Sequence, residues 1–119
     1  MKTHKDLIAW QKSIDLVVDI YEITKQFPQN EIYGLISQIR RSVISIPSNI
    51  AEGAGRKSNK ELLYFLNISL GSLSELETQI IISNRLNYIN EDEFMKINEK
   101  IQELFKIISG LKNSLKSNS

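Results

Sequence analysis

The sequence predicts an all-α protein, an antiparallel up-down-up-down four-helix bundle that forms a single domain over residues 1–119. Apolar residues recur at steps of three and four in four segments, which is the spacing of one helix face. The connections between these segments are short, and short connections place sequential helices antiparallel. A chain of 119 residues with 41% hydrophobic content is long enough for one modest core and too short for two.

The first helix is expected from Asp6 to Gln26, where Pro28 prevents it from continuing. Either Thr3 or Asp6 is suited to cap its beginning. One stripe of apolar side chains is expected to face the core, and it consists of Leu7, Trp10, Ile14, Val17 and Tyr21.

The second helix is expected from near Tyr33 to Gly53. Its core stripe consists of Ile39, Val43, Ile46 and Ile50. Pro47 lies inside the pattern, where it removes a backbone donor and is expected to bend the helix. Glycine accepts the left-handed conformation that closes many helices, so Gly53 and Gly55 are expected to end this one.

The second helix also carries a stripe of polar side chains at helical spacing. Most of these are small groups that hydrogen-bond at close range, unlike the long charged side chains of an ordinary solvated face. We expect them to meet polar residues of the third helix inside the bundle, where each can satisfy another. The predicted structural network consists of Gln38, Ser45, Asn49, Glu52, Ser69, Ser72 and Glu75.

The third helix is expected from Asn59 to Leu86, beginning with a capping box between Ser58 and Glu61. Its core stripe is Leu62, Leu66, Leu73, Leu76 and Ile80, with Ser69 at a core position. Further apolar residues lie on other faces, more than a four-helix monomer can cover, so they predict a subunit interface: Leu63, Phe65, Ile68, Leu70 and Ile81. Gly71 costs roughly 1 kcal/mol in mid-helix, which predicts a neighbouring backbone close to it.

The fourth helix begins after two asparagines that suit helix ends. Asn87 tolerates the left-handed conformation and is expected to close the third helix. Asn90 is expected to cap the fourth helix in a capping box with Glu93, and Ile89 to pack on Phe94 as a hydrophobic staple. An unbroken heptad then follows, with Phe94, Ile97, Ile101, Leu104, Ile108, Leu111 and Leu115.

The composition argues against most catalytic chemistry. The chain has no cysteine and one histidine, His4, which excludes thiolate sites, a histidine-based serine triad and a di-iron bundle site. No phosphate-binding glycine motif follows a predicted strand. An enzyme that uses Glu52, Glu75 and Glu77 remains an alternative, although carboxylates on such helices are more often structural. We therefore predict a cytoplasmic protein that is not an enzyme, with no cofactor, metal, small-molecule substrate or membrane partner.

A local group of basic residues is the candidate for binding nucleic acid, because a net charge of +1 argues against binding through bulk charge. Antiparallel packing gathers Arg56, Lys57 and Lys60 at one turn, beside the positive dipole end of the third helix. Arg40 and Arg41 lie more than ~15 Å away, so they form a separate site or serve the polar network. In the alternative interpretation, these residues only solvate the surface and Arg56 pairs with a glutamate one turn before it.

Several motifs resemble one known family. They are Asp6-Leu7 with Trp10-Gln11-Lys12, Phe27-Pro28 with Glu31 and Tyr33-Gly34-Leu35, Gln38 with Arg40-Arg41, the segment Ser45-Ile46-Pro47-Ser48-Asn49-Ile50-Ala51-Glu52-Gly53, and then Arg56, Ser58, Gly71-Ser72, Glu75-Leu76-Glu77 and Tyr88. Together they span nearly the whole chain, and the SIPSNIAEG segment is highly specific. The chain resembles the four-helix-bundle proteins encoded within intervening sequences of 23S ribosomal RNA genes, often labelled S23 ribosomal proteins.

The resemblance implies a ring-shaped homopentamer. The family is similar to the accessory variability determinant protein of diversity-generating retroelements, a pentameric barrel that works with a reverse transcriptase and nucleic acid. The leading hypothesis is therefore a ring that binds RNA, DNA or a nucleoprotein through a basic rim. The alternatives are a protein-interaction scaffold that binds no nucleic acid, and the carboxylate enzyme.

Overall fold

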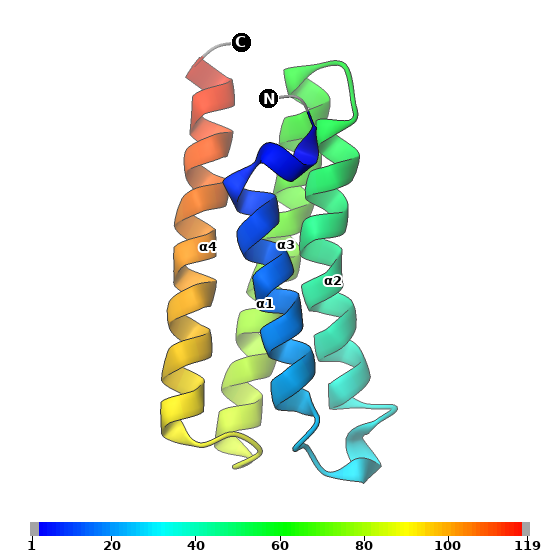
Figure 1. Cartoon of the computed structure of the whole chain (residues 1–119), viewed down its shortest axis with the longest axis vertical. Helices are drawn as coiled ribbons and strands as arrows, with labels where there is room; N and C mark the ends of the chain where they lie inside the picture. Colours follow the sequence, from blue (N-terminus) through cyan, green and yellow to red (C-terminus); the bar gives the residue numbers. More distant parts are fainter. Residues whose placement is uncertain (1–2, 118–119) are drawn as a thin grey trace.

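Four helices account for most of the structure, a computed structural model that describes residues 3–117. They are α1 (Ile8–Thr24), α2 (Leu35–Ala54), α3 (Asn59–Arg85) and α4 (Glu91–Ser117), with short 3-10 turns at η1 (His4–Asp6) and η2 (Gln29–Glu31). No strand occurs in this part of the chain, so the predicted all-α class is confirmed. Figure 1 shows successive helices running in opposite directions along a bundle of 46 × 24 × 20 Å. None of the helices within residues 3–117 is long and apolar enough to cross a membrane.

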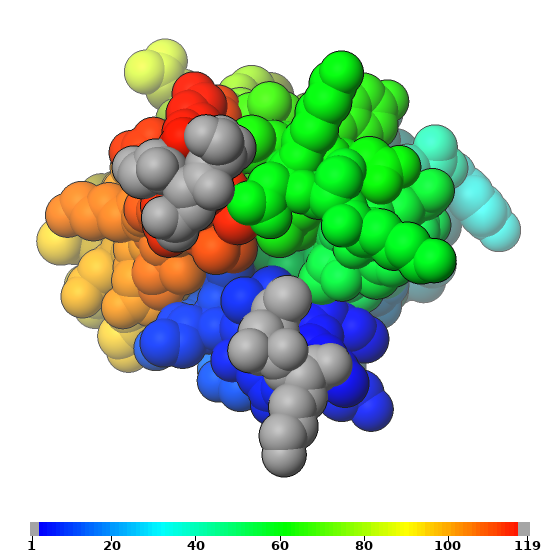
Figure 2. Space-filling model, turned by 90° about the horizontal axis from the view of Figure 1, so that it is seen from above, coloured from blue at the N-terminus to red at the C-terminus, as the bar shows by residue number. Residues whose placement is uncertain are grey.

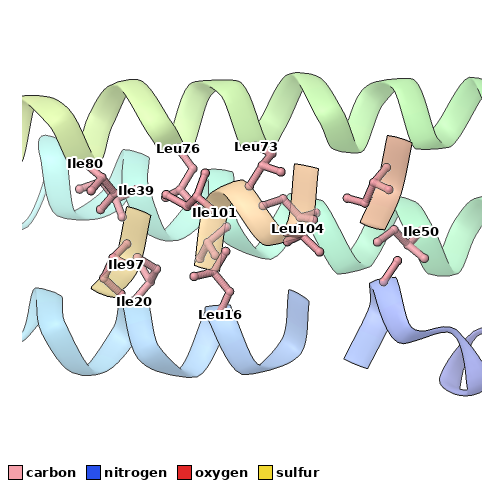
Figure 3. Close-up of a cluster of buried hydrophobic side chains, with 14 of the residues drawn as sticks. Leu16, Ile20, Ile39, Ile50, Leu73, Leu76, Ile80, Ile97, Ile101 and Leu104 are labelled. Atoms are coloured by element: carbon pink, nitrogen blue, oxygen red, sulfur yellow. The ribbon is translucent and has the colours of Figure 1, made fainter. Parts of the chain in front are cut away.

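Each helix packs against the two that are its neighbours in a closed cycle, α1 to α2 to α3 to α4 and back to α1. The core lies on the axis of this cycle and receives side chains from all four helices. Figure 3 shows Leu16 and Ile20 of α1 pointing toward the side chains of the other helices, among them Ile101 of α4. The heptad of α4 supplies the fully or almost fully buried Ile97, Ile101, Leu104 and Ile108, as its spacing predicts.

The expected core stripe of α1 is wrong by about one residue. The buried residues of α1 are Ala9, Ser13, Leu16, Ile20 and Thr24, whereas Leu7, Trp10, Ile14, Val17 and Tyr21 are only half-buried. One residue corresponds to a rotation of about 100° around the helix. Because α1 packs against both α2 and α4, its core face lies between them, and the predicted stripe lines only the side toward α2.

The beginning of α1 also differs from the expectation. The helix begins at Ile8 rather than Asp6, and Leu7 at its N-cap makes no side-chain cap. Thr3 and Asp6 form a capping box together, but it belongs to the preceding turn η1. The chain therefore uses both predicted caps one turn earlier than expected.

Gly53 and Gly55 do not close α2 in the left-handed conformation. Gly55 has a φ of −80°, and no glycine within the described residues has a positive φ. Gly53 lies inside the helix, where a Cβ atom would come 2.7 Å from the Cβ of Phe65 in α3. Glycine at this position therefore permits close contact between α2 and α3. The helix continues through Pro47 without interruption.

The helix ends with a local chemical signal are confirmed. Ser58 Oγ accepts a hydrogen bond from the Glu61 amide at 3.2 Å, which caps α3, while the Glu61 carboxylate accepts from the Ser58 hydroxyl rather than from its amide, so the expected capping box is half formed. Asn87 has a φ of 62°, and the Tyr88 amide donates to the Ser83 carbonyl at 2.9 Å, so α3 ends in a Schellman motif. Asn90 and Glu93 form the reciprocal capping box of α4, with distances of 2.8 and 2.9 Å.

A tyrosine connects the two loops at this end of the bundle. Tyr88 Oη donates to Glu31 Oε2 at 2.8 Å, which joins η2 to the connection between α3 and α4. The hydrogen bond favours the neutral hydroxyl, and together with desolvation and the charge of Glu31 it raises the pKa of Tyr88. The loop contact is therefore retained below the ordinary pKa of tyrosine and is lost as the pH rises through the raised value.

Candidate nucleic-acid interface

The turn between α2 and α3 presents three exposed basic side chains at one end of the bundle. Arg56 and Lys57 lie in the turn itself and Lys60 lies in the first turn of α3. Figure 2 looks onto this end, where side chains of the green turn project away from the bundle. The amides of the first turn of α3 have no partner within the helix apart from capping groups, and the helix dipole is positive here. We call Arg56, Lys57 and Lys60 the basic rim.

The rim borders a depression with an aromatic wall. It has a volume of about 490 Å³ and is lined by Arg56, Lys60, Glu61, Tyr64 and Phe65. The guanidinium of Arg56 lies 5.2 Å from the centroid of the Phe65 ring, and the rings of Tyr64 and Phe65 meet edge to face at 5.1 Å. Tyr64 is largely exposed. Cations that border exposed aromatic rings suit both a phosphate and an unpaired base.

Arg56 also forms the ion pair that the alternative interpretation expects. Its Nη2 lies 3.4 Å from Glu52 Oε2, with both side chains about half exposed. Exposed pairs of this kind contribute at most about 1 kcal/mol and weaken as salt increases. The pair therefore leaves the guanidinium accessible to a competing phosphate. Glu52 is turned outward and does not join a buried network.

Arg40 lies in a different environment, where it joins α2 to α1. Its guanidinium carbon lies 4.4 Å from the centroid of the Tyr21 ring. Its Nε donates to Thr24 Oγ1 at 3.0 Å and its Nη2 donates to the Tyr21 carbonyl at 3.3 Å. With these three contacts Arg40 is a packing residue of the α1–α2 contact, while the neighbouring Arg41 is exposed. The structure thus separates both residues from the basic rim.

Short polar side chains join α2 to α3 along the middle of the bundle. The hydroxyls of Ser45 and Ser72 lie 2.8 Å apart. Asn49 Nδ2 donates to the carbonyl of Ser45 at 2.8 Å and to its hydroxyl at 3.0 Å. The buried Ser69 Oγ donates to the backbone carbonyl of Ile46 at 2.9 Å. The structure therefore places these four side chains between the two helices, where Ser45, Ser72 and Asn49 form one connected network and Ser69 bonds separately to the backbone of α2.

Two of the predicted network residues lie outside it. Gln38 is exposed, and its backbone carbonyl accepts a hydrogen bond from Ser42 Oγ at 3.0 Å. The same Ser42 hydroxyl lies 3.2 Å from Glu75 Oε1, which adds a separate polar contact between α2 and α3 one turn along the bundle. Gln38 and Glu52 fall outside because their positions on α2 point toward solvent rather than toward α3.

The glutamates of the enzyme alternative are dispersed. Glu52 faces Arg56, Glu75 faces Ser42, and Glu77 Oε2 accepts a hydrogen bond from Gln102 of α4 at 2.6 Å. The three carboxylates thus have three different partners and do not converge on one site. Within residues 3–117, no group of three metal-ligating side chains lies close enough together to hold an ion.

The five residues expected at a subunit interface divide into two sets. Leu63, Phe65 and Leu70 are half-buried within the chain, with Phe65 close to Gly53 of α2 and Leu70 packed against the core. Ile68 and Ile81 stay 36% and 41% exposed, and Ile82, which sequence reasoning missed, is 42% exposed. Gly71 lies between them, and a Cβ atom added to it would meet no other atom within 4 Å. The neighbouring backbone expected there is therefore absent from the described part of the chain.

Comparison with known proteins agrees with this architecture. The family described as 23S rRNA-intervening sequence protein matches residues 5–110. A crystal structure from Bacteroides thetaiotaomicron, of a protein with unknown function from the S23 ribosomal protein family, is similar with a TM-score of 0.79 and 26% identity. The similarity covers 88% of this chain and 98% of that one. No curated protein matches the chain. The resemblance that the sequence motifs indicate is confirmed.

Proposed function

The chain belongs to the 23S rRNA-intervening sequence protein family, and from this premise we propose that it is a non-enzymatic ring, a pentamer, that binds nucleic acid through its basic rim. The observation that carries the proposal is the combination of Arg56 and Lys60 with the exposed Tyr64 around one depression. One ligand in this depression can therefore contact a cation and an exposed aromatic ring together.

The rim is suited to single-stranded RNA or DNA. Phosphates bind to Lys57, Lys60 and the amides at the beginning of α3, where the helix dipole adds a favourable field. An unpaired base stacks on the exposed ring of Tyr64, which the paired bases of a duplex cannot reach. Base stacking tolerates any sequence, so we expect weak sequence preference.

Assembly multiplies these contacts. Three cations on a subunit of net charge +1 bind a strand weakly. A ring repeats the rim in each subunit, and a strand that follows the ring engages several rims at once. Linked weak contacts then produce an affinity that no single subunit has.

Binding of labelled single-stranded RNA to the assembled protein, followed by anisotropy across a salt series, tests the proposal. We expect affinity to fall steeply with salt, and Lys57→Gln and Lys60→Gln to flatten the slope of log affinity against log salt by about 0.7 per contact removed. Tyr64→Ala should weaken binding with an unchanged slope, because it removes stacking and no charge. Lys25→Gln is the matched control, since Lys25 is an exposed lysine at the opposite end of the bundle, paired with Glu22.

The second candidate is a protein-interaction scaffold that binds no nucleic acid. The ion pair between Arg56 and Glu52 favours it, because it uses one of the three rim cations within the chain. The same titration separates the two candidates. An intact oligomer that binds neither RNA nor DNA at about 50 mM salt, where phosphate contacts are strongest, decides for the scaffold.

A further inference from the structure

An apolar groove runs along the outer side of α1 and α2. It has a volume of about 290 Å³ and is lined by Trp10, Ile14 and Val17 of α1 and by Ile44, Pro47, Ser48 and Ala51 of α2, of which only Ser48 is polar. Trp10, Ile14 and Val17 point toward α2, but no other part of the subunit covers them, so they are only half-buried. Exposed Val18 continues the apolar surface beside it. We call this surface the α1–α2 groove.

A second apolar surface lies on the outer side of α3. Ile68 is exposed there, and one turn further along α3 Gly71 leaves open space in which another backbone can approach closely. We call the surface around Ile68 and Gly71 the α3 face. The groove and the α3 face lie on different sides of α2, so they are two distinct surfaces of one subunit.

The two surfaces lie at the same level of the bundle. Ser45 is opposite Ser72 and the Ile46 carbonyl is opposite Ser69, as their hydrogen bonds show. The α2 wall of the groove is therefore level with the part of α3 that contains Ile68 and Gly71. A closed ring requires contacts without axial displacement, and two complementary surfaces at one level satisfy this condition.

Charge supports the same pairing. The segments from Ser42 to Ala51 in α2 and from Leu62 to Ser74 in α3 contain no charged residue on any side. Surfaces that meet solvent normally carry charges in nearly every turn, as α4 does with Lys96, Glu99 and Glu103. An uncharged surface of one copy can be buried against an uncharged surface of another copy without desolvating an ion.

We propose that the α1–α2 groove receives the α3 face of a second copy of this chain, in a head-to-tail contact that leaves α4 on the outside of the ring. The inference rests on the oligomer of the proposed function and adds which surfaces meet. Its symmetry is testable, because a head-to-tail contact uses two different surfaces whereas a two-fold contact uses one surface twice.

Sedimentation velocity of three variants at micromolar concentration provides the first test. Ile44→Glu places a carboxylate in the groove and Ile68→Glu places one on the α3 face. We expect each to weaken association by about 100-fold or more, because the charge would be buried without a partner. Met95→Glu is the control, since Met95 is an exposed apolar residue on α4. Thermal unfolding by circular dichroism verifies that each variant is folded.

Mixing the two interface variants provides the decisive test. Ile44→Glu keeps an intact α3 face and Ile68→Glu keeps an intact groove, so an equimolar mixture should form dimers with one of each and no ring. Two folded variants that stay monomeric together overturn the head-to-tail pairing. An oligomer that withstands both substitutions, or that dissociates equally with Met95→Glu, overturns the choice of surfaces. Neither result affects rim binding, which the salt titration of the wild-type protein decides separately.

Discussion

The contact between α2 and α3 differs in kind from the contact between α1 and α4. The first is made by glycine and short polar side chains, with Gly53 against Phe65 and Ser45 against Ser72. The second is bordered by long charged side chains, with Lys100 paired to Asp19 and Lys12 to Glu103. Short groups hydrogen-bond only at one spacing and one register, whereas long side chains adapt to several. The α2–α3 pair is therefore the part of the bundle whose geometry is most closely specified.

The comparison extends to the surfaces around each contact. α2 and α3 each contain a segment of several turns without a charged residue. The α1–α4 side instead carries ion pairs and an open depression whose lining includes Lys96, Lys100 and Glu103. Charged side chains keep a surface hydrated, and their absence leaves a surface available for burial. The specified pair thus coincides with the part of the molecule that we propose to be covered in the oligomer.

The largest expected effect comes from filling the closest contact. Gly53→Val should lower the free energy of unfolding by roughly 3 kcal/mol, because its side chain would overlap the Cβ of Phe65 and separate the helices. Gly110→Val is the matched control on α4, with nothing within 4 Å of the added atom. Chemical denaturation at one fixed protein concentration measures both. Equal stability of the two variants would mean that α2 and α3 are not in close contact.

A smaller loss is expected from the polar network. Asn49→Ala removes the donor to both Ser45 oxygens and leaves a half-buried carbonyl with one partner fewer, which should cost about 1 to 2 kcal/mol. Thr78→Ala is a control on α3, because the Thr78 hydroxyl is exposed and bonds only within its own turn. Thermal unfolding of Asn49→Ala at the wild-type temperature would contradict a structural role for the network.

The smallest effect is expected on the charged side. Lys100→Ala removes the ion pair with Asp19 and should cost less than about 1 kcal/mol, because both side chains are partly exposed. The difference from wild type should shrink further in 1 M salt, where screening is strong. A large loss that is insensitive to salt would show that the α1–α4 contact is as specific as the α2–α3 contact.

Sequence reasoning succeeded where a feature depends on neighbouring residues alone. The cap at Ser58, the left-handed Asn87 and the capping box of Asn90 follow from local chemistry, and the structure confirms all three. The α4 heptad is equally local. These features together define the fold class and three of the helix ends.

The failures concern features that depend on several helices at once. The core face of α1 is set by its packing against both α2 and α4. The apolar stripe predicted for α1 therefore lies beside that core face rather than on it. Gly53 and Gly55 lie at the end of α2 as expected, with Gly55 as its C-cap, but the close contact of Gly53 with α3 is invisible in the sequence. Arg40 adjoins Arg41 in the chain, yet its contacts lie on α1, where Tyr21 and Thr24 are three residues apart and share a face.

The mass of the wild-type protein in solution tests the central claim most directly, since both the repeated rim and the covered surfaces require assembly. Sedimentation at micromolar concentration should show a closed oligomer with no intermediates, of about five times the subunit mass of 13.7 kDa. A single species of 13.7 kDa at tens of micromolar would contradict the ring and leave the α1–α2 groove and the α3 face exposed to solvent.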